Sequence, residues 1–70
     1  MAFTYKPLWR MLIDSDMTKE DLRIALKLSP TTIAKMGKDQ NVSMDVLDKI
    51  CAHFSCEISQ VIEWYRTYDE

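Results

Sequence analysis

One short stretch of the chain carries side chains that could bind a metal ion. Cys51, His53 and Cys56 are spaced as Cys-x-His-x-x-Cys, and thiolate and imidazole groups are common zinc ligands. A structural zinc site usually needs four such ligands, supplied as two separated pairs. The chain has one histidine and two cysteines, so it lacks a second pair. Because free cysteine commonly behaves as a small buried hydrophobic residue, we expect no metal and no cofactor.

The sequence offers no arrangement that is typical of an enzyme. It has no glycine-rich phosphate loop, since Gly37 is its one glycine. Cys51 and His53 lie two residues apart on an expected helix, so their side chains do not face each other. The carboxylates are scattered, which favours solvated charges over general acids and bases. We therefore expect a protein that is not an enzyme.

The length and composition favour one small domain over residues 1–70. The chain is 47% hydrophobic, has one Gly and two Pro, and shows no internal repeat. No apolar run approaches the roughly 18 residues that a membrane span needs, and the N-terminus lacks the apolar centre of a signal peptide. Two cysteines do not make a disulfide framework. We therefore expect a cytoplasmic protein with reduced thiols and no membrane partner.

The charge is unevenly distributed along the chain. The formal net charge is −2, which by itself does not indicate a nucleic-acid partner. Residues 1–42 hold seven Lys and Arg against five Asp and Glu, whereas residues 43–70 hold two against six. This polarity would orient the positive half toward a polyanion, although solvated surface charge explains it nearly as well.

The stretch from Thr18 to Gly37 has the signals of two short helices joined by a tight turn. Thr18 can cap the first helix, and Asp21 three residues later makes a near capping box. Ser29 and Pro30 begin the second helix as N-cap and first residue, because the missing N–H of proline costs nothing there. Gly37 is expected to end it, as glycine commonly does.

Helical spacing continues on both sides of this stretch. A first helix, capped by Thr4, is expected to follow a loose lead-in at residues 1–4 and to reach about Asp16. A fourth is expected over residues 44–54, and a fifth from near Ile58. The residues expected in the core of these helices are Tyr5, Leu8, Trp9, Leu12, Ile13, Leu22, Leu26, Ile33, Leu47, Ile50, Phe54, Ile58 and Ile62.

These elements resemble the helix-turn-helix of the Cro/CI (lambda-repressor-like, Xre) family of DNA-binding domains. The residues that carry the resemblance are Thr18, Leu22, Leu26, Leu28, Ser29, Ile33, Met36 and Gly37. The resemblance implies an all-α, compact five-helix domain whose helices 2 and 3 form the motif at residues 18–37. It also implies a small transcriptional regulator that binds double-stranded DNA as a homodimer.

Three residues depart from the usual pattern of the family. Lys19 stands where members usually have Gln, Arg23 where they have Ala, and Lys27 where the turn has Gly. Arg23 must lay its stem along the surface and carry its charge to water. In the left-handed conformation, Lys27 would cost about 1–2 kcal/mol relative to Gly.

The resemblance also implies which residues contact DNA. In this family the second helix of the motif enters the major groove and its first two turns reach base edges. The residues that would contact bases are Ser29, Pro30, Thr31, Thr32 and Lys35. Those that would contact phosphates are Thr18, Lys19, Lys38, Gln40 and Asn41. Because the reading helix lacks Arg, Asn and Gln, we expect modest sequence specificity.

Aromatic residues near the end of the chain leave two interpretations open. Lambda-repressor-like domains often dimerise through their last helix, which implies a dimer interface at Trp64, Tyr65 and Tyr68. Alternatively, Trp64 folds over the first helix and completes the core. The acidic balance and these aromatics also suit a different function, a protein-interaction or antitoxin-like module on the same fold with weak or no DNA binding.

Overall fold

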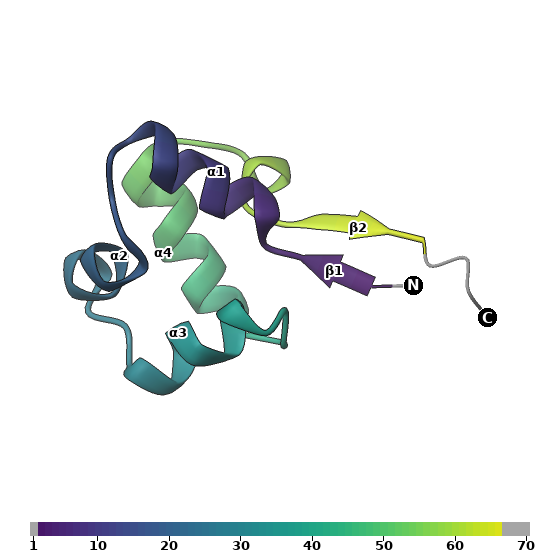
Figure 1. The fold of residues 1–70 in the computed structure, drawn as a ribbon, viewed down its shortest axis with the longest axis horizontal. Helices are drawn as coiled ribbons and strands as arrows, with labels where there is room; N and C mark the ends of the chain where they lie inside the picture. Colours follow the sequence, from purple (N-terminus) through teal and green to yellow (C-terminus); the bar gives the residue numbers. More distant parts are fainter. Residues whose placement is uncertain (1, 67–70) are drawn as a thin grey trace.

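Four α-helices and one pair of short strands make up residues 2–66, the part of the chain that the computed structural model describes (Figure 1). In chain order the elements are β1 (Ala2–Thr4), α1 (Lys6–Asp14), α2 (Lys19–Leu26), α3 (Pro30–Gly37), α4 (Met44–Phe54), the single 3₁₀ turn η1 (Ile58–Gln60) and β2 (Glu63–Tyr65). The helices form one body, and the strands project from it as an arm (Figure 1). None of these helices is long and apolar enough to cross a membrane.

Helices α2, α3 and α4 begin at the caps that the sequence predicts. Thr18 and Asp21 form a complete capping box, with the Asp21 N–H donating to Thr18 Oγ1 at 3.1 Å and the Thr18 N–H donating to Asp21 Oδ2 at 3.0 Å. Ser29 caps α3, and Pro30 is its first residue. Ser43 caps α4, whose bounds confirm the predicted helix at residues 44–54. Local sequence therefore decides where these three helices start.

Each α-helix is followed by a residue other than glycine in the left-handed conformation. These residues are Asp16, Lys27, Asp39 and Ser55, with φ between 52° and 58°. After α2, for example, the Leu28 N–H donates back to the Arg23 carbonyl at 2.9 Å, which satisfies a carbonyl that the helix end leaves free. α3 ends at Gly37, as predicted, but Gly37 does not adopt the left-handed conformation that glycine commonly takes there, and Asp39 adopts it two residues later.

Replacing Lys27 with glycine is expected to raise the free energy of unfolding by about 0.5–1 kcal/mol. Lys27 adopts the left-handed conformation, and relief of its steric cost exceeds the entropy that glycine adds to the unfolded chain. Urea denaturation measures the change. The matched control is Lys38→Gly, because Lys38 has a φ of −107° and gains nothing from glycine. A less stable Lys27→Gly variant would contradict the assignment.

The core takes one or more side chains from every helix. The largest fully buried residues are Leu8, Leu22, Met36, Ile50 and Val61, and Tyr5, Leu12 and Leu47 complete the buried cluster. Trp9, Leu26, Ile33, Phe54 and Ile62 pack against it while partly exposed. Two expected core residues lie at the surface instead, since Ile13 is 75% exposed and Ile58 is 47% exposed.

The expected fifth helix is replaced by a turn and a strand. Among the described residues after α4, only η1 is helical, and β2 pairs antiparallel with β1 so that Phe3 lies opposite Trp64 and Thr4 opposite Glu63. The lead-in expected at residues 1–4 is therefore strand over Ala2–Thr4. The apolar and aromatic residues after η1 fit a helix period but also favour extended structure, and β1 offers them a partner. Tyr68 lies outside the described residues.

The first helix also differs from expectation at both ends. It begins at Lys6, with Tyr5 rather than Thr4 as N-cap and no side-chain bond from that cap. It ends at Asp14 rather than Asp16, because Asp16 turns the chain into the left-handed conformation. The free N–H of Tyr5 is instead met by a distant residue, Asp39, whose Oδ1 accepts it at 3.1 Å.

Candidate nucleic-acid interface

The turn between α2 and α3 fixes the direction of the candidate reading helix. Lys27, in the left-handed conformation, turns the chain at the end of α2. The side chain of Leu28 is buried and only 6% exposed. Ser29 then caps α3 in extended geometry, with a φ of −74° and a ψ of 153°. Three consecutive residues therefore end one helix, anchor the turn and begin the next.

One side of α3 is buried and the other faces solvent. Met36 is fully buried, and Thr32 and Ile33 beside it are half-buried. Residues three, four and seven positions apart share a helix face, so the exposed residues form a single surface. This outer face of α3 consists of Thr31, Ala34, Lys35 and Lys38.

The residues predicted to contact bases divide into two groups. Thr31 and Lys35 lie on the outer face of α3 and are exposed. Ser29 and Thr32 are engaged with each other, because their hydroxyl oxygens lie 2.9 Å apart and the Thr32 N–H donates to Ser29 Oγ at 3.1 Å. Pro30 is exposed in the first turn. The structure thus presents Thr31 and Lys35 outward and uses Ser29 and Thr32 to begin the helix.

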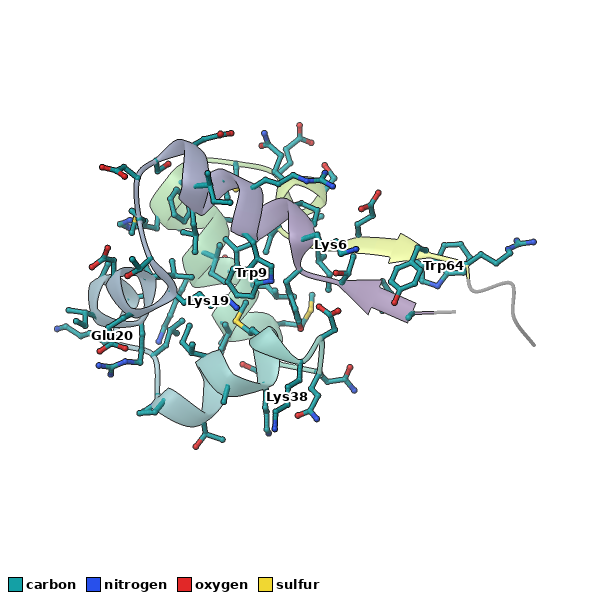
Figure 2. All side chains as sticks on the ribbon, viewed as in Figure 1. Lys6, Trp9, Lys19, Glu20, Lys38 and Trp64 are labelled. Carbon is teal, nitrogen blue, oxygen red and sulfur yellow. The ribbon has the colours of Figure 1, made fainter. Side chains whose placement is uncertain are left out.

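Two predicted phosphate-contacting residues lie at the start of α2. The hydroxyl of Thr18 accepts the Asp21 N–H in the capping box. Lys19 follows it as the first helical residue, and its Nζ lies 4.4 Å from the centroid of the Trp9 ring (Figure 2). Among residues 2–66 the structure shows one ion pair, between Arg23 and Glu20, so no carboxylate of that part of the chain neutralises Lys19.

The other predicted phosphate-contacting residues follow α3. Lys38 is its C-cap and projects away from the helical body (Figure 2), and Gln40 and Asn41 are exposed in the loop. This loop is held from behind, because the Tyr5 hydroxyl donates to the Gln40 carbonyl at 2.8 Å. Asp39 turns its carboxylate toward Tyr5 and Thr4. The structure therefore leaves Lys38, Gln40 and Asn41 exposed beside α3 and turns the carboxylate of Asp39 inward.

Comparison with known proteins shows to which family these helices belong. The sequence model of the Cro/C1-type helix-turn-helix DNA-binding domain matches residues 7–66. The chain belongs to this family. The resemblance inferred from the motif residues is therefore confirmed, with four α-helices over the described residues in place of the five expected.

A solved structure supports the same conclusion for this Cro/C1-type domain. The chain is similar to the crystal structure of the transcriptional regulator VanUg, form II, with 45% sequence identity and a TM-score of 0.85. The match covers 89% of this chain and 83% of the VanUg chain. A comparison with curated protein sequences returned no match.

Neighbouring charges around the motif of this Cro/C1-type domain are partly paired. Arg23 Nε donates to Glu20 Oε1 at 2.9 Å, and its Nη2 contacts the second oxygen. These hydrogen bonds hold the pKa of Glu20 below its usual range and raise that of Arg23. Arg23 thus reaches the surface as expected, but its charge is paired with Glu20. Burial, reinforced by the charge of Asp39, raises the pKa of the Tyr5 phenol.

The cysteines and histidine of the domain lie at the end of α4. Cys51 and Cys56 are free, half-buried and packed against the core, and burial raises the pKa of the Cys56 thiol. His53 packs edge-on against Phe54, with ring centroids 4.8 Å apart. Over residues 2–66 no three potential ligand side chains are grouped in a way that could hold a metal ion.

The aromatic residues predicted at a dimer interface lie on the arm. Trp64 is 46% exposed and Tyr65 41% exposed, and Phe3, directly opposite Trp64, is 53% exposed. Trp64 also lines a shallow groove that it shares with Pro7 and Met11 of α1. The sequence analysis did not single out Phe3, because its place beside Trp64 depends on strand pairing between the two ends of the chain.

Proposed function

We propose that this chain is a transcriptional regulator that reads duplex DNA in a sequence-dependent manner, with α3 in the major groove. The observation that carries the proposal is the outer face of α3, which presents a hydroxyl and two ammonium groups and no carboxylate. Such a face suits the acceptors of guanine and the methyl of thymine in the major groove. A family membership that covers residues 7–66 supports the same reading.

The proposed roles of individual residues follow from their positions. Lys35 bonds guanine O6 or N7, and Thr31 contacts a neighbouring base edge or thymine methyl. Lys19 and the free N–H groups at the start of α2 bind the phosphates of one strand, and Lys38, Gln40 and Asn41 bind those of the other. Ser29 and Thr32 act chiefly by holding the first turn of α3.

We further propose that residues 1–70 act as one domain that dimerises through the arm. Two strands of three residues are marginal when isolated, and here they expose Phe3, Trp64 and Tyr65. Large exposed aromatic residues are typical anchors of protein interfaces. Two copies related by a two-fold axis would present two α3 helices to half-sites about one helical turn apart.

Selection from a random duplex library tests the DNA-reading proposal. Sequencing of the bound fraction should reveal a two-fold symmetric site. With that duplex, Lys35→Ala is expected to weaken binding by about 1–3 kcal/mol and to relax preference at one base position, and Thr31→Ala to weaken it less. Lys49→Ala, which changes an exposed lysine on α4, serves as the control. Unchanged affinity in a folded Thr31→Ala/Lys35→Ala double variant would refute the proposal.

The oligomeric state of Trp64→Ala tests the arm as an interface. Sedimentation equilibrium should show a dimer for the parent chain and a monomer for this variant, because the anchor residue is lost. Ile13→Ala removes an exposed apolar side chain from α1, well away from the arm in sequence, and should leave the dimer intact. A Trp64→Ala variant that dimerises like the parent would show that Trp64 is not an anchor.

If no duplex is selected, the exposed arm favours the alternative function, a protein-interaction module. Comparing the partners captured by the parent chain and by Trp64→Ala would test that alternative.

A further inference from the structure

Lys19 and Trp9 meet between two helices in front of the core. The Lys19 ammonium lies over the face of the Trp9 ring, 4.4 Å from its centroid, and both side chains occupy the centre of the face shown in Figure 2. An ammonium in this position is attracted by the negative face of the indole. The contact joins the start of α2, where a phosphate contact is proposed, to the middle of α1.

Both ends of the Lys19 side chain are held in place. Its backbone is the first residue of α2, whose start is fixed by the capping box of Thr18 and Asp21. The ring under its ammonium is itself fixed, because Trp9 is packed against the core and lies 6.5 Å from the ring of Tyr5. A lysine side chain normally loses much rotamer freedom when it binds, and here part of that loss has occurred before binding.

Gly37 borders the same ammonium from α3. A Cβ built on Gly37 would lie 3.7 Å from Lys19 Nζ, so the bare backbone of this residue leaves the ammonium uncovered. Gly37 lies three residues after Ala34, at the edge of the outer face of α3. The ammonium is therefore fixed beside the surface that is proposed to enter the major groove. It keeps two or more N–H donors for another ligand while one side contacts the ring.

We propose that Trp9 is a positioning residue that holds the Lys19 ammonium ready for a phosphate of the DNA backbone, and that glycine at position 37 keeps the approach of that phosphate open. The inference rests on the proposed DNA binding and adds two residues to it. Trp9 touches no DNA in this scheme. It acts by reducing the disorder that Lys19 loses on binding, and it leaves the charge of Lys19 exposed.

A double-mutant cycle on the whole chain, residues 1–70, tests the role of Trp9. The variants are Lys19→Met, Trp9→Leu and their combination, titrated with the duplex from the library selection at several salt concentrations. Lys19→Met should lower the slope of log K against log salt by about one phosphate contact. Trp9→Leu should weaken binding roughly two- to fivefold when Lys19 is present and have no effect when it is combined with Lys19→Met. Trp9→Phe, which keeps an aromatic face, should bind nearly as tightly as the parent.

Two outcomes of this cycle would overturn the inference. Equal weakening by Trp9→Leu in both backgrounds would mean that Trp9 acts only through the fold. An unchanged salt slope in Lys19→Met would mean that Lys19 contacts no phosphate. If Lys35→Ala weakens binding while either outcome is found, DNA reading stands and only this inference fails. If the parent chain binds no duplex, both fall.

Fluorescence supplies a test that does not depend on the folding of Trp9→Leu. The chain has two tryptophans, so Trp64→Phe leaves Trp9 as its one indole. Saturation with the selected duplex should change the fluorescence emission of Trp9, because a phosphate then binds the ammonium that lies over its ring. Adding Lys19→Met should remove most of this change. An emission that does not respond to DNA would contradict the inference.

A substitution at Gly37 tests the open approach. Gly37→Leu should leave the chain folded, since Gly37 is exposed and a Cβ there meets only the flexible end of Lys19, at 3.7 Å, but should weaken DNA binding by covering the ammonium. Ala52→Leu makes a similar addition at an exposed position of α4 and should leave DNA affinity unchanged. Parent-like affinity in Gly37→Leu would show that the missing side chain plays no part in phosphate binding.

Discussion

Replacing Met36 with alanine is expected to lower the free energy of unfolding by about 2–5 kcal/mol. Met36 is the fully buried residue on the inner side of α3, and its truncation removes apolar contacts and leaves a cavity. Domains of this length bury only about 60% of the surface of the unfolded chain, so a loss of this size is a large share of their total stability. Chemical denaturation followed by circular dichroism measures it.

Met44 provides the matched control for this prediction. It is the first residue of α4 and is 78% exposed, so Met44→Ala should change stability by about 0.5 kcal/mol or less. Similar losses in the two variants would contradict the burial of Met36. Met36 lies on the inner side of α3 and does not reach its outer face, so Met36→Ala should weaken DNA binding only through unfolding. Lys35→Ala, in contrast, should weaken DNA binding in a folded protein.

Replacing Asp39 with alanine is expected to cost about 2–4 kcal/mol of stability. The carboxylate accepts hydrogen bonds from the Tyr5 N–H at 3.1 Å and from the Thr4 hydroxyl at 3.3 Å, and Thr4 is only 4% exposed. Alanine leaves these donors without their partner. It also tolerates the left-handed conformation, here with a φ of 56°, less well than aspartate does. Thermal or urea denaturation gives the change.

Two further substitutions at position 39 separate these contributions. Asp39→Asn keeps an acceptor oxygen and tolerates a positive φ, so it should cost about 1 kcal/mol or less. Asp39→Gly removes the conformational strain but also both hydrogen bonds, and should fall between the asparagine and alanine variants. If the Asp39→Ala and Asp39→Asn variants are equally stable, the hydrogen bonds to Tyr5 and Thr4 contribute nothing to stability. A loss in Asp39→Ala should also loosen the loop that carries Lys38 and Gln40.

The sequence by itself determined the helix-turn-helix and the presence of α1 and α4 on either side of it. Thr18, Ser29 and Ser43 cap their helices through hydrogen bonds from amides three residues away, and the turn falls at Lys27, where the pattern of the family places it. Such interactions join near neighbours, so residue type and spacing suffice to predict them. The family followed from the same residues, because the motif is a local structure. The outward position of Thr31 and Lys35 then follows from helical periodicity around buried Met36.

Only the tertiary structure decided how the two ends of the chain are used. Residues after η1 carry an apolar pattern that fits a helix as well as a strand, and the choice depends on β1, whose residues lie about 60 positions earlier. The bond between Asp39 and Tyr5 and the contact between Lys19 and Trp9 likewise join separate helices or their ends. No local pattern records such pairs, because they form only when packing brings distant residues together. The exposed arm and the held position of Lys19 are therefore properties of the folded chain.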